Sequence, residues 1–532
     1  MEGRPLCRPK YYGHDRACPS TNKMKRVFGL ETEYGITVTG TDAVDVVAES
    51  IELVRRYTDH GAHMKWDYEL EDPHLDARGF RAKELLQDTD ESAYYEIDKN
   101  RPLSFEEIKS DLVLSNGARF YNDHAHPEYS TPECTTLRQI VEQDKAGERI
   151  LAECARRRNA KLPPEQQVRL YKNNTDFVGH SYGCHDNYLV AREISWDRIV
   201  AGMLPFLITR QIFAGAGKMG VEAESTASQP GIYQISQRAD FFSVLVSIDT
   251  MNRRPLVNTR DEPHADTNRY RRFHVILGDS NMSEWATAMK MGTTSLVLDL
   301  IEQGKTPQLE IAQPIDAHKS ISRDQTYDWI IELKDGRKIS AIDVQRIYLK
   351  AAAKLETNES DEDRAWILRE WESVLDDLER DVMLTRNRID WAANKALLNA
   401  LQQEEKLSWT DPWLQSVDLE YHNIDFDHGL YYELVRQGSA HRVTTEDDIK
   451  GAIYNPPETT RAFFRGRSVA RFNDEIASIQ WDEIVFANGS SSCRIGLPEA
   501  GLDQRLTALN QAARNGKDFS EFLRAVEVAA QL

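Results

Sequence analysis

Two glutamates stand two residues apart in the segment Gly29-Leu30-Glu31-Thr32-Glu33-Tyr34-Gly35. On a β-strand, side chains at positions i and i+2 point to the same face. Two neighbouring carboxylates repel each other, and a divalent cation such as Mg²⁺, which binds oxygen ligands and bridges to phosphates, relieves that repulsion. The pattern therefore predicts a metal site at Glu31 and Glu33. The alternative is a solvent-exposed strand face, which commonly carries such charges without a metal.

A second group of reactive side chains follows about ninety residues later. Arg119, Tyr121 and Asp123 alternate along the chain, so a strand would place them on one face. An arginine there can hold phosphate oxygens, and a carboxylate beside a metal-bound phosphate can act as a general base or a nucleophile. The alternative is a polar turn after a strand, in which His124 and His126 make structural hydrogen bonds.

Further polar segments occur at 172–176, 181–188, 258–266 and 459–467. One of them contains His185, a candidate metal ligand, next to Cys184, for which no activating arrangement with a histidine is evident. Another contains Arg260, a candidate for phosphate binding. The alternatives are hydrogen-bonded turns rich in Asn and Asp, and salt bridges at the surface.

Hydrophobic periodicity predicts the elements that must position these groups. Strands are expected at 25–39, 111–121, 168–172 and 186–191, and short strands near Ile232, Leu256 and His274. Helices are expected at 43–57, 137–158, 196–213 and 283–303, the last capped by Ser283. Asp335-Gly336 predicts a hairpin within 330–339. Two long helices are expected within 341–403, then one strand at 479–486 and two short C-terminal helices.

The same pattern divides the chain into a large strand-rich unit at 24–440 and a small C-terminal domain at 441–532. Residues 1–23 are polar and are expected to form a disordered extension. Residues 67–105 are acidic and are interrupted by Pro73, Gly79 and Pro102. A stretch of this length without periodicity predicts an inserted flexible loop.

Composition excludes several classes of function. The chain has 532 residues and a formal net charge of −20, which repels nucleic acid in the absence of a long basic stripe. The sequence contains no run of eighteen apolar residues, so no membrane span is predicted. Six cysteines without C-x-x-C pairs argue against a disulfide framework or a zinc site and favour a reducing compartment, the cytoplasm. No Gly-x-x-x-x-Gly-Lys-Ser/Thr phosphate loop is present.

Taken in order, these segments resemble the Pup ligase and Pup deamidase/depupylase family. The resemblance runs from Met24 through nearly the whole chain and is carried by strings such as Asn258-Thr259-Arg260-Asp261-Glu262-Pro263-His264-Ala265-Asp266 and Gly278-Asp279-Ser280-Asn281-Met282. It implies an α+β, glutamine-synthetase-like fold, in which a curved antiparallel sheet backed by helices cradles ATP and Mg²⁺, with a small C-terminal domain. It also implies an enzyme that acts on Pup, a small disordered protein modifier.

The resemblance assigns roles residue by residue. It implies Mg²⁺ ligands at Glu31, Glu33, Tyr121 and Glu128, with His185 and His264 as further candidates. It implies contacts to ATP, or to ADP with phosphate, from Arg119, Thr131, Arg260 and Trp481. Asp123 would be the catalytic carboxylate, and Arg238 would contact Pup.

The family has two branches with opposite reactions, joining Pup to a substrate lysine or hydrolysing that bond and deamidating a C-terminal glutamine of Pup. Three features resemble the hydrolytic branch: the insertion with 66–69 and 76–80, the short spacing from Asp123 to His126, and the segments 463–467 and 481–486. Residues 31–33, 181–185, 280–284 and 421–422 resemble the ligase more. We therefore expect a hydrolase whose partners are Pup and pupylated proteins. Ligation is the alternative, and a non-catalytic Pup-binding regulator is the second alternative, against which the intact carboxylate set argues.

Overall fold

The computed structural model describes residues 26–41, 44–57, 62–63, 66–68, 71–85, 101–223, 226–355, 361–488, 491–498 and 504–530. The predicted extension at 1–23 and residues 86–100 of the predicted loop lie outside this part of the chain.

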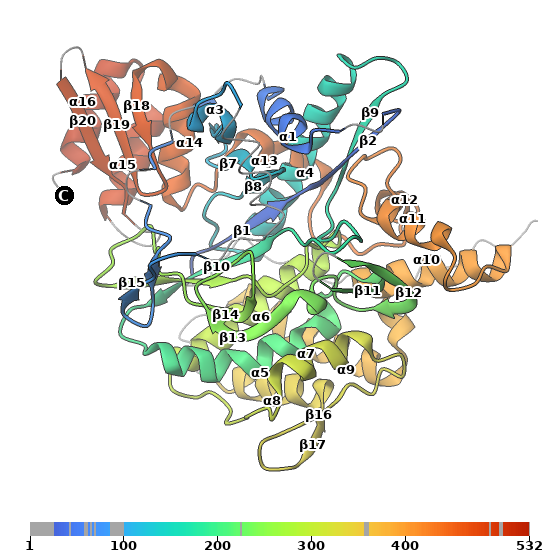
Figure 1. Cartoon of the computed structure of the whole chain (residues 1–532). Helices are drawn as coiled ribbons and strands as arrows, with labels where there is room; N and C mark the ends of the chain where they lie inside the picture. Colours follow the sequence, from blue (N-terminus) through green and yellow to red (C-terminus); the bar gives the residue numbers. More distant parts are fainter. Residues whose placement is uncertain are drawn as a thin grey trace, which may run out of the picture.

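A seven-stranded antiparallel sheet lies at the centre of the molecule, with the strand order β15-β10-β1-β8-β7-β6-β3 (Figure 1). Its strands are β1 (Phe28–Glu33), β3 (Ala62–His63), β6 (Leu112–Leu114), β7 (Arg119–Asp123), β8 (His126–Ser130), β10 (Cys184–Ala191) and β15 (Tyr270–Val275). Phe28 and Leu30 are buried in the core, while Glu31 and Glu33 alternate with them. One face of the sheet is therefore apolar and the other carries the charged residues.

Helices cover the apolar face. These are α1 (Val46–Arg55), α4 (Leu137–Asn159), α5 (Trp196–Ala214) and α6 (Glu284–Glu302), and they confirm the four predicted helices. Ser283 caps α6, because its hydroxyl accepts a hydrogen bond from the backbone N–H of Ala286. Residues of α4, α5 and α6 share one core cluster with Phe28 and Leu30 of β1. The packing of the helices thus fixes the back of the sheet and leaves its charged face open.

Smaller sheets surround the central one. Their strands are β2 (Gly35–Thr39), β4 (Leu75–Asp76), β5 (Phe80–Arg81), β9 (Gln167–Tyr171), β11 (Lys218–Ala223), β12 (Thr226–Gln234), β13 (Phe242–Ser247), β14 (Arg254–Asn258), β16 (Ile330–Glu332) and β17 (Lys338–Ser340). The remaining helices of the large unit are α3 (Phe105–Lys109), α7 (Pro314–Arg323), α8 (Ala341–Ala353), α9 (Glu362–Arg380), α10 (Asp390–Glu405), α11 (Pro412–Tyr421), α12 (Leu430–Arg436) and α13 (Glu446–Tyr454). The predicted strands at 168–172 and 186–191, those near Ile232, Leu256 and His274, and the hairpin at 330–339 are confirmed.

Several stretches contain more elements than predicted. Where one strand was predicted at 25–39, the described residues form two, because β1 pairs in the central sheet while β2 pairs with β9. Residues 111–121 form the hairpin of β6 and β7, with Gly117 in the left-handed region at φ 80°. Residues 341–403 contain three long helices, α8 to α10, in place of two. The predicted strand at 479–486 is two strands separated by a turn at Trp481.

The described part of the predicted loop is partly ordered into regular structure. Residues 75–81 form the hairpin of β4 and β5, in which Gly79 has φ 92°. This hairpin is fastened to the strand-like segment at Thr259, since the N–H of Ala77 donates to the carbonyl of Thr259 at 2.7 Å. The hydroxyl of Thr259 donates to the buried carboxylate of Asp76 at 2.6 Å. Residues 75–81 of the predicted loop therefore form regular structure, which contacts with residues far away in the sequence hold in place.

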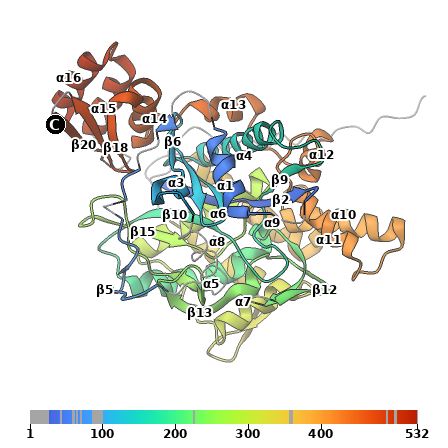
Figure 2. The same cartoon turned by 45° about the horizontal axis from the view of Figure 1, so that its top comes forward.

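The C-terminal part has its own core. It comprises α14 (Arg461–Phe472), β18 (Ile476–Ile479), β19 (Glu483–Asn488), β20 (Ser491–Gly496), α15 (Gln504–Asn515) and α16 (Phe519–Ala530). Figures 1 and 2 show it in red at one side of the molecule, opposite the α10–α11 pair. Helix α13 instead packs against α4 of the large unit. We therefore propose a domain boundary between α13 and α14, somewhat later than residue 440. Among the described helices, none has the length and apolar character of a membrane span.

Candidate active site

A cleft of about 380 Å³ lies on the charged face of the central sheet. It is lined by most of the residues that the sequence singled out: Glu31, Glu33, Arg119, Tyr121, Asp123, Glu128, His185, Arg238, Arg260, His264 and Trp481. Thr131 lines a mainly apolar hollow of about 100 Å³ that adjoins the cleft. Glu31, Ser130 and Trp481 border both spaces. The predicted site residues therefore come together around one continuous space.

Three carboxylates form the first cluster in the cleft. Glu33 of β1 and Glu128 of β8 are direct cross-strand partners, and Asp123 ends the neighbouring β7. One carboxylate oxygen of each residue lies within 4.8 Å of the others. Burial raises the pKa of Glu128 well above its usual range, and repulsion from Asp123, Glu31 and Glu33 adds to this effect. Such an excess of negative charge on closely spaced oxygens fits a divalent cation of the Mg²⁺ type.

Glu31 forms a second cluster with two histidines. Its Oε2 lies 3.1 Å from Nδ1 of His185 and 3.5 Å from Nε2 of His274, while its Oε1 accepts a hydrogen bond of 3.0 Å from Asn187. Burial opposes ionisation of Glu31, but the contacts with His185 and His274 outweigh it and hold the pKa of Glu31 well below its usual range. Glu31 is therefore an ionised carboxylate that could serve a metal.

Two residues beside Glu31, namely His274 and Arg272, were missed by sequence reasoning, although a signal exists. Nη1 of Arg272 lies 3.2 Å from Oε1 of Glu31. Arg272 and His274 alternate along β15, as His185 and Asn187 alternate along β10. In the register, His274 lies opposite Asn187. The pairing of β15 with β10 brings Arg272 and His274 to the face of the sheet that carries Glu31. That pairing cannot be read from the sequence.

Asp123 lies where β7 turns into β8. The two-residue turn is tight, because His124 adopts φ 53°, and Asp123 is the register partner of His126. Its Oδ1 accepts a hydrogen bond of 2.7 Å from Nζ of Lys109, a residue that sequence reasoning did not identify. Burial opposes ionisation of Asp123, but the charges of Lys109 and His124 outweigh it and lower its pKa. Asp123 is thus held as a carboxylate at the edge of the cleft.

Arg119 and Tyr121 line the wall beside this carboxylate. The guanidinium of Arg119 lies between two rings, 4.1 Å from the centroid of Trp66 and 4.0 Å from that of Tyr121. Its Nε donates to Asp111 at 2.7 Å. Tyr121 is the cross-strand partner of Glu128. The ring contacts and the ion pair hold the guanidinium of Arg119 in the wall of the cleft, where an arginine could bind phosphate.

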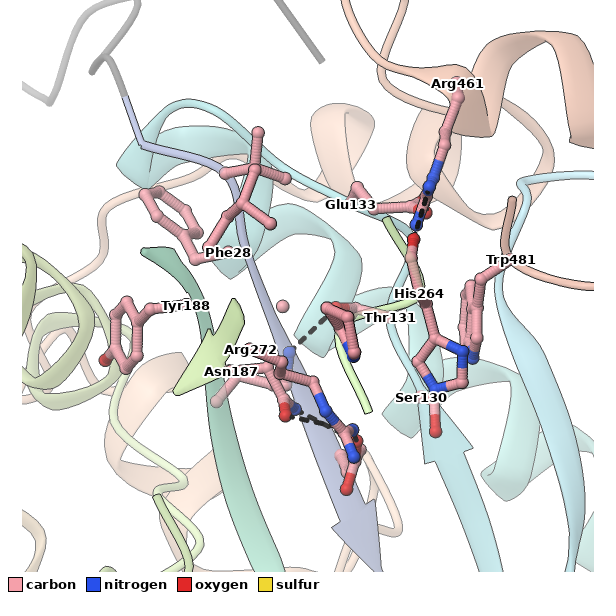
Figure 3. Close-up of a pocket in the computed structure, with 16 residues that line it drawn as sticks. Phe28, Ser130, Thr131, Glu133, Asn187, Tyr188, His264, Arg272, Arg461 and Trp481 are labelled. Atoms are coloured by element: carbon pink, nitrogen blue, oxygen red, sulfur yellow. Dashed lines mark hydrogen bonds and ion pairs between the residues drawn. The ribbon is translucent and has the colours of Figure 1, made fainter. Parts of the chain in front are cut away.

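The apolar hollow is closed by the small C-terminal domain. Figure 3 shows Thr131 and His264 in its wall, with Trp481 beside His264 and with Arg461 directed at Glu133. Nε of Arg461 donates to Glu133 at 2.6 Å, and its Nη1 donates to the carbonyl of His264 at 2.7 Å. The hydroxyl of Thr131 accepts a hydrogen bond of 3.0 Å from the N–H of Leu30. The hollow could take an apolar group next to the polar cleft.

The remaining predicted residues differ in their environment. His264 belongs to neither metal-capable cluster found among the described residues, and its backbone has φ 46°. Arg260 lines the cleft, and its Nε is buried, has no hydrogen-bond acceptor in the described part of the chain and lies 3.9 Å from the carboxylate of Glu262. Arg238 is almost fully buried, and its Nη1 donates to the carbonyl of Ile276 at 2.6 Å. Burial, with the charge of Arg254, lowers the pKa of Arg238 to about 10.

A cleft lined with carboxylates and arginines on an antiparallel sheet, beside an apolar hollow, is the arrangement of an enzyme. The sequence profile of the Pup-ligase protein family matches residues 26–485. The chain therefore belongs to the Pup-ligase family.

Proteins from both branches of this family are similar to the chain. A depupylase of Acidothermus cellulolyticus is 44% identical over 473 residues, covering 87% of this chain and 91% of that protein. A Pup deamidase/depupylase of Mycolicibacterium smegmatis is 42% identical over 476 residues, covering 88% and 93%. A Pup–protein ligase of Actinosynnema mirum is 43% identical over 368 residues, covering 68% and 80%.

Two solved structures share the fold. One is the complex between the prokaryotic ubiquitin-like protein Pup and its ligase PafA, with a TM-score of 0.72 and 32% identity, covering 94% of this chain and 97% of that chain. The other is the Pup ligase PafA in complex with ADP, with a TM-score of 0.69 and 34% identity, covering 82% and 97%. These matches confirm the predicted α+β architecture with an antiparallel sheet backed by helices.

Proposed function

We propose that this protein is an ATP- and Mg²⁺-dependent amide hydrolase that deamidates the C-terminal glutamine of Pup and cleaves the bond between Pup and a lysine. The observation that carries the proposal is the ionised Asp123 at the edge of the three-carboxylate cluster, in the cleft that continues into the apolar hollow. The similar proteins named for depupylation are 44% and 42% identical over 87% and 88% of the chain, whereas a Pup–protein ligase of Paenarthrobacter aurescens is 39% identical over 91% of it. The higher identity at similar coverage supports hydrolysis over ligation.

The site offers suitable groups for both cofactors. Glu33 and Glu128 would hold Mg²⁺ in one cluster, and Glu31 with His185 would hold it in the other. The apolar hollow at Trp481 would take the base of ATP, or of ADP with phosphate, and Arg260 would face the phosphates. Bound nucleotide and Mg²⁺ supply charge and oxygen ligands next to the reacting amide. A precedent is the ligase structure with ADP.

In this proposal the carboxylate of Asp123 is the reacting group in amide hydrolysis. In deamidation and in cleavage of the lysine bond, the same γ-carbonyl carbon of the last Pup residue is attacked and the same C–N bond breaks. Asp123 either attacks that carbon itself or takes a proton from the attacking water. The nitrogen leaves with a proton, as ammonia in one case and as the lysine amine in the other. One water is consumed in each reaction, so one site can serve both.

Two further parts of the proposal concern access and location. We propose that the segment at 67–105 controls access to the cleft, because Glu71, Pro73 and Leu85 of its described part line the cleft. Deleting 71–85 should then change the rate of hydrolysis, and an unchanged rate would contradict this role. We also propose a cytoplasmic location, since the described cysteines Cys134, Cys154, Cys184 and Cys493 are all free thiols.

The test compares three substrates, each supplied with ATP and Mg²⁺: Pup ending in glutamine, a Pup–lysine conjugate, and Pup ending in glutamate with free lysine. Ammonia released from Pup ending in glutamine, and free lysine released from a Pup–lysine conjugate, are the expected products. Adducts between lysine and Pup ending in glutamate, with accumulation of ADP, would instead establish the ligase. Binding of Pup without any product would leave a regulator. Asp123→Asn is the matched control, since it removes the proposed reacting group and keeps the size of the side chain.

A further inference from the structure

Lys109 is the last residue of the short helix α3 and makes a direct contact with Asp123. The distance between Nζ of Lys109 and Oδ1 of Asp123 is 2.7 Å. Both side chains are largely enclosed, with 20% and 26% of their surfaces exposed. An ion pair with this degree of burial is screened less by solvent than a surface pair and holds a more defined geometry.

The backbone around Lys109 is fixed on both sides. Ser104 and Glu107 form a capping box at the start of α3, and Ser110 ends the helix in the left-handed conformation with φ 50°. The side chain of Asn122, the neighbour of Asp123, donates to the carbonyl of Ile108 at 3.1 Å. The strand that carries the carboxylate is therefore tied directly to the helix that carries the ammonium.

The geometry of strand β7 does not by itself fix the orientation of the Asp123 carboxylate. Its carboxylate lies close to those of Glu33 and Glu128, which repel it. Lys109 provides the closest positive charge, since the other cation near Oδ1, His124, lies 3.9 Å away and is charged only when protonated. Within the described residues, Oδ2 of Asp123 accepts no hydrogen bond. One oxygen is thus held by Lys109 while the second remains available to react.

We propose that Lys109 is a positioning residue, whose ammonium orients the carboxylate of Asp123 toward the scissile amide of Pup. This inference rests on the proposed hydrolytic function and deepens it. In this role Lys109 donates no proton in the reaction and acts through Asp123, while its side chain also lines the cleft. It keeps Oδ1 fixed, so that the Oδ2 lone pair reaches the carbonyl carbon or its attacking water. A displacement of a reacting group by about 1 Å costs on the order of 10²-fold in rate.

The experiment measures ammonia release from Pup ending in glutamine by wild type, Lys109→Met and Lys109→Arg. We expect Lys109→Met to lower kcat by about 10²-fold while KM for Pup and the affinity for ATP stay within about threefold, because only the reacting geometry changes. Lys109→Arg should recover most of kcat, since it restores the positive charge. Lys334→Met is the matched control, because Lys334 pairs with the carboxylate of Glu310 at 2.8 Å on the exposed surface, away from the cleft.

The double variant Lys109→Met/Asp123→Asn separates positioning from a general effect on folding. If Lys109 acts through Asp123, the double variant has the same residual rate as Asp123→Asn alone. A further loss in the double variant, or an unchanged kcat in Lys109→Met, would overturn the proposal. A crystal structure of Lys109→Met gives a readout without turnover, and an Asp123 side chain in the same rotamer as in the wild type would also overturn it.

Failure of the hydrolytic function itself gives a different result. In that case the wild type releases no ammonia and forms lysine adducts with Pup ending in glutamate. The same variants are then compared in the rate of adduct formation, because ligation would also require an oriented carboxylate at Asp123. Equal rates for wild type and Lys109→Met would contradict the role of Lys109.

Discussion

Glu33 of β1 and Glu128 of β8 are direct cross-strand neighbours on the charged face of the sheet. Their carboxylates share one cluster with Asp123, and the pKa of Glu128 is raised by burial and by repulsion from its neighbours. Two acidic residues placed opposite each other destabilise a sheet unless a cation lies between them. The folded protein therefore carries an electrostatic cost at this position that bound metal would relieve.

Removing one of these charges should separate folding from metal binding. We expect Glu128→Gln to unfold in EDTA at the same Tm as wild type or higher, because one repulsive carboxylate is gone. In excess Mg²⁺ the wild type should gain about 2–3 kcal/mol, as expected for ligand near one hundred times its Kd, and the variant should gain far less. Calorimetry with and without Mg²⁺ measures both. Glu404→Gln, on the exposed side of α10, is the control. Equal Mg²⁺ stabilisation of all three proteins would exclude this cluster as the metal site.

Asp123→Asn should abolish turnover and leave nucleotide binding intact. The amide keeps the shape of the carboxylate but cannot act as a base or a nucleophile, which costs about 10²–10⁴-fold in rate. Ammonia release and ATP titration by calorimetry measure the two properties on the same preparation. Full activity of the variant would remove Asp123 from the reaction.

The docking of the small domain should depend on Arg465. This arginine is fully buried; its Nη2 donates to the carbonyl of Gly117 at 2.8 Å, and the same atom lies 2.5 Å from the carboxylate of Glu133. Arg465→Met leaves the largely enclosed carboxylate of Glu133 with Arg461 as its remaining charged partner and removes the donor to Gly117, which costs about 3–5 kcal/mol. We also expect weaker ATP binding, because Glu133 lines the apolar hollow.

Urea unfolding and ATP titration test this prediction together. Arg467→Met on the same helix is the control, since the contact between Arg467 and Asn455 is exposed and its loss should cost less than about 1 kcal/mol. If both variants lose the same stability, the buried contact of Arg465 is not what holds the domain.

Stability should also fall as the pH rises through the neutral range, because of Asp418. This buried side chain accepts hydrogen bonds from the N–H of Met219 at 2.7 Å and from Asn394 at 2.6 Å. Burial raises the pKa of Asp418 to about 7. In the unfolded chain an aspartate has a pKa of about 3.9, so between about pH 4 and 7 the native state binds the proton and the unfolded state does not.

The free energy of unfolding should therefore decrease across this window by up to about 1.4 kcal/mol per pH unit from this group. Asp418→Asn removes the titration. We expect the stability difference between wild type and variant to shrink between pH 5 and pH 8 in urea unfolding. The same difference at both pH values would show that Asp418 is ionised in the native state.

By itself, the sequence determined the local features. The alternation of Glu31 with Glu33, and of Arg119 with Tyr121 and Asp123, placed each set on one face of its strand, as the structure shows. Periodicity and capping located helices such as α4 and α6 to within a few residues. These features depend on residues a few positions apart, so they can be predicted from the order of the residues alone.

The tertiary structure alone decided which distant side chains meet. His274 reaches Glu31 because β15 pairs with β10 and β10 with β1, and the ammonium of Lys109 reaches Asp123 because α3 packs against β7. The hairpin at Asp76 became regular structure through contacts with Thr259, 183 residues away. Strand pairing and ion pairs of this kind depend on contacts between residues far apart in the chain, and hydrophobic periodicity contains no information about them.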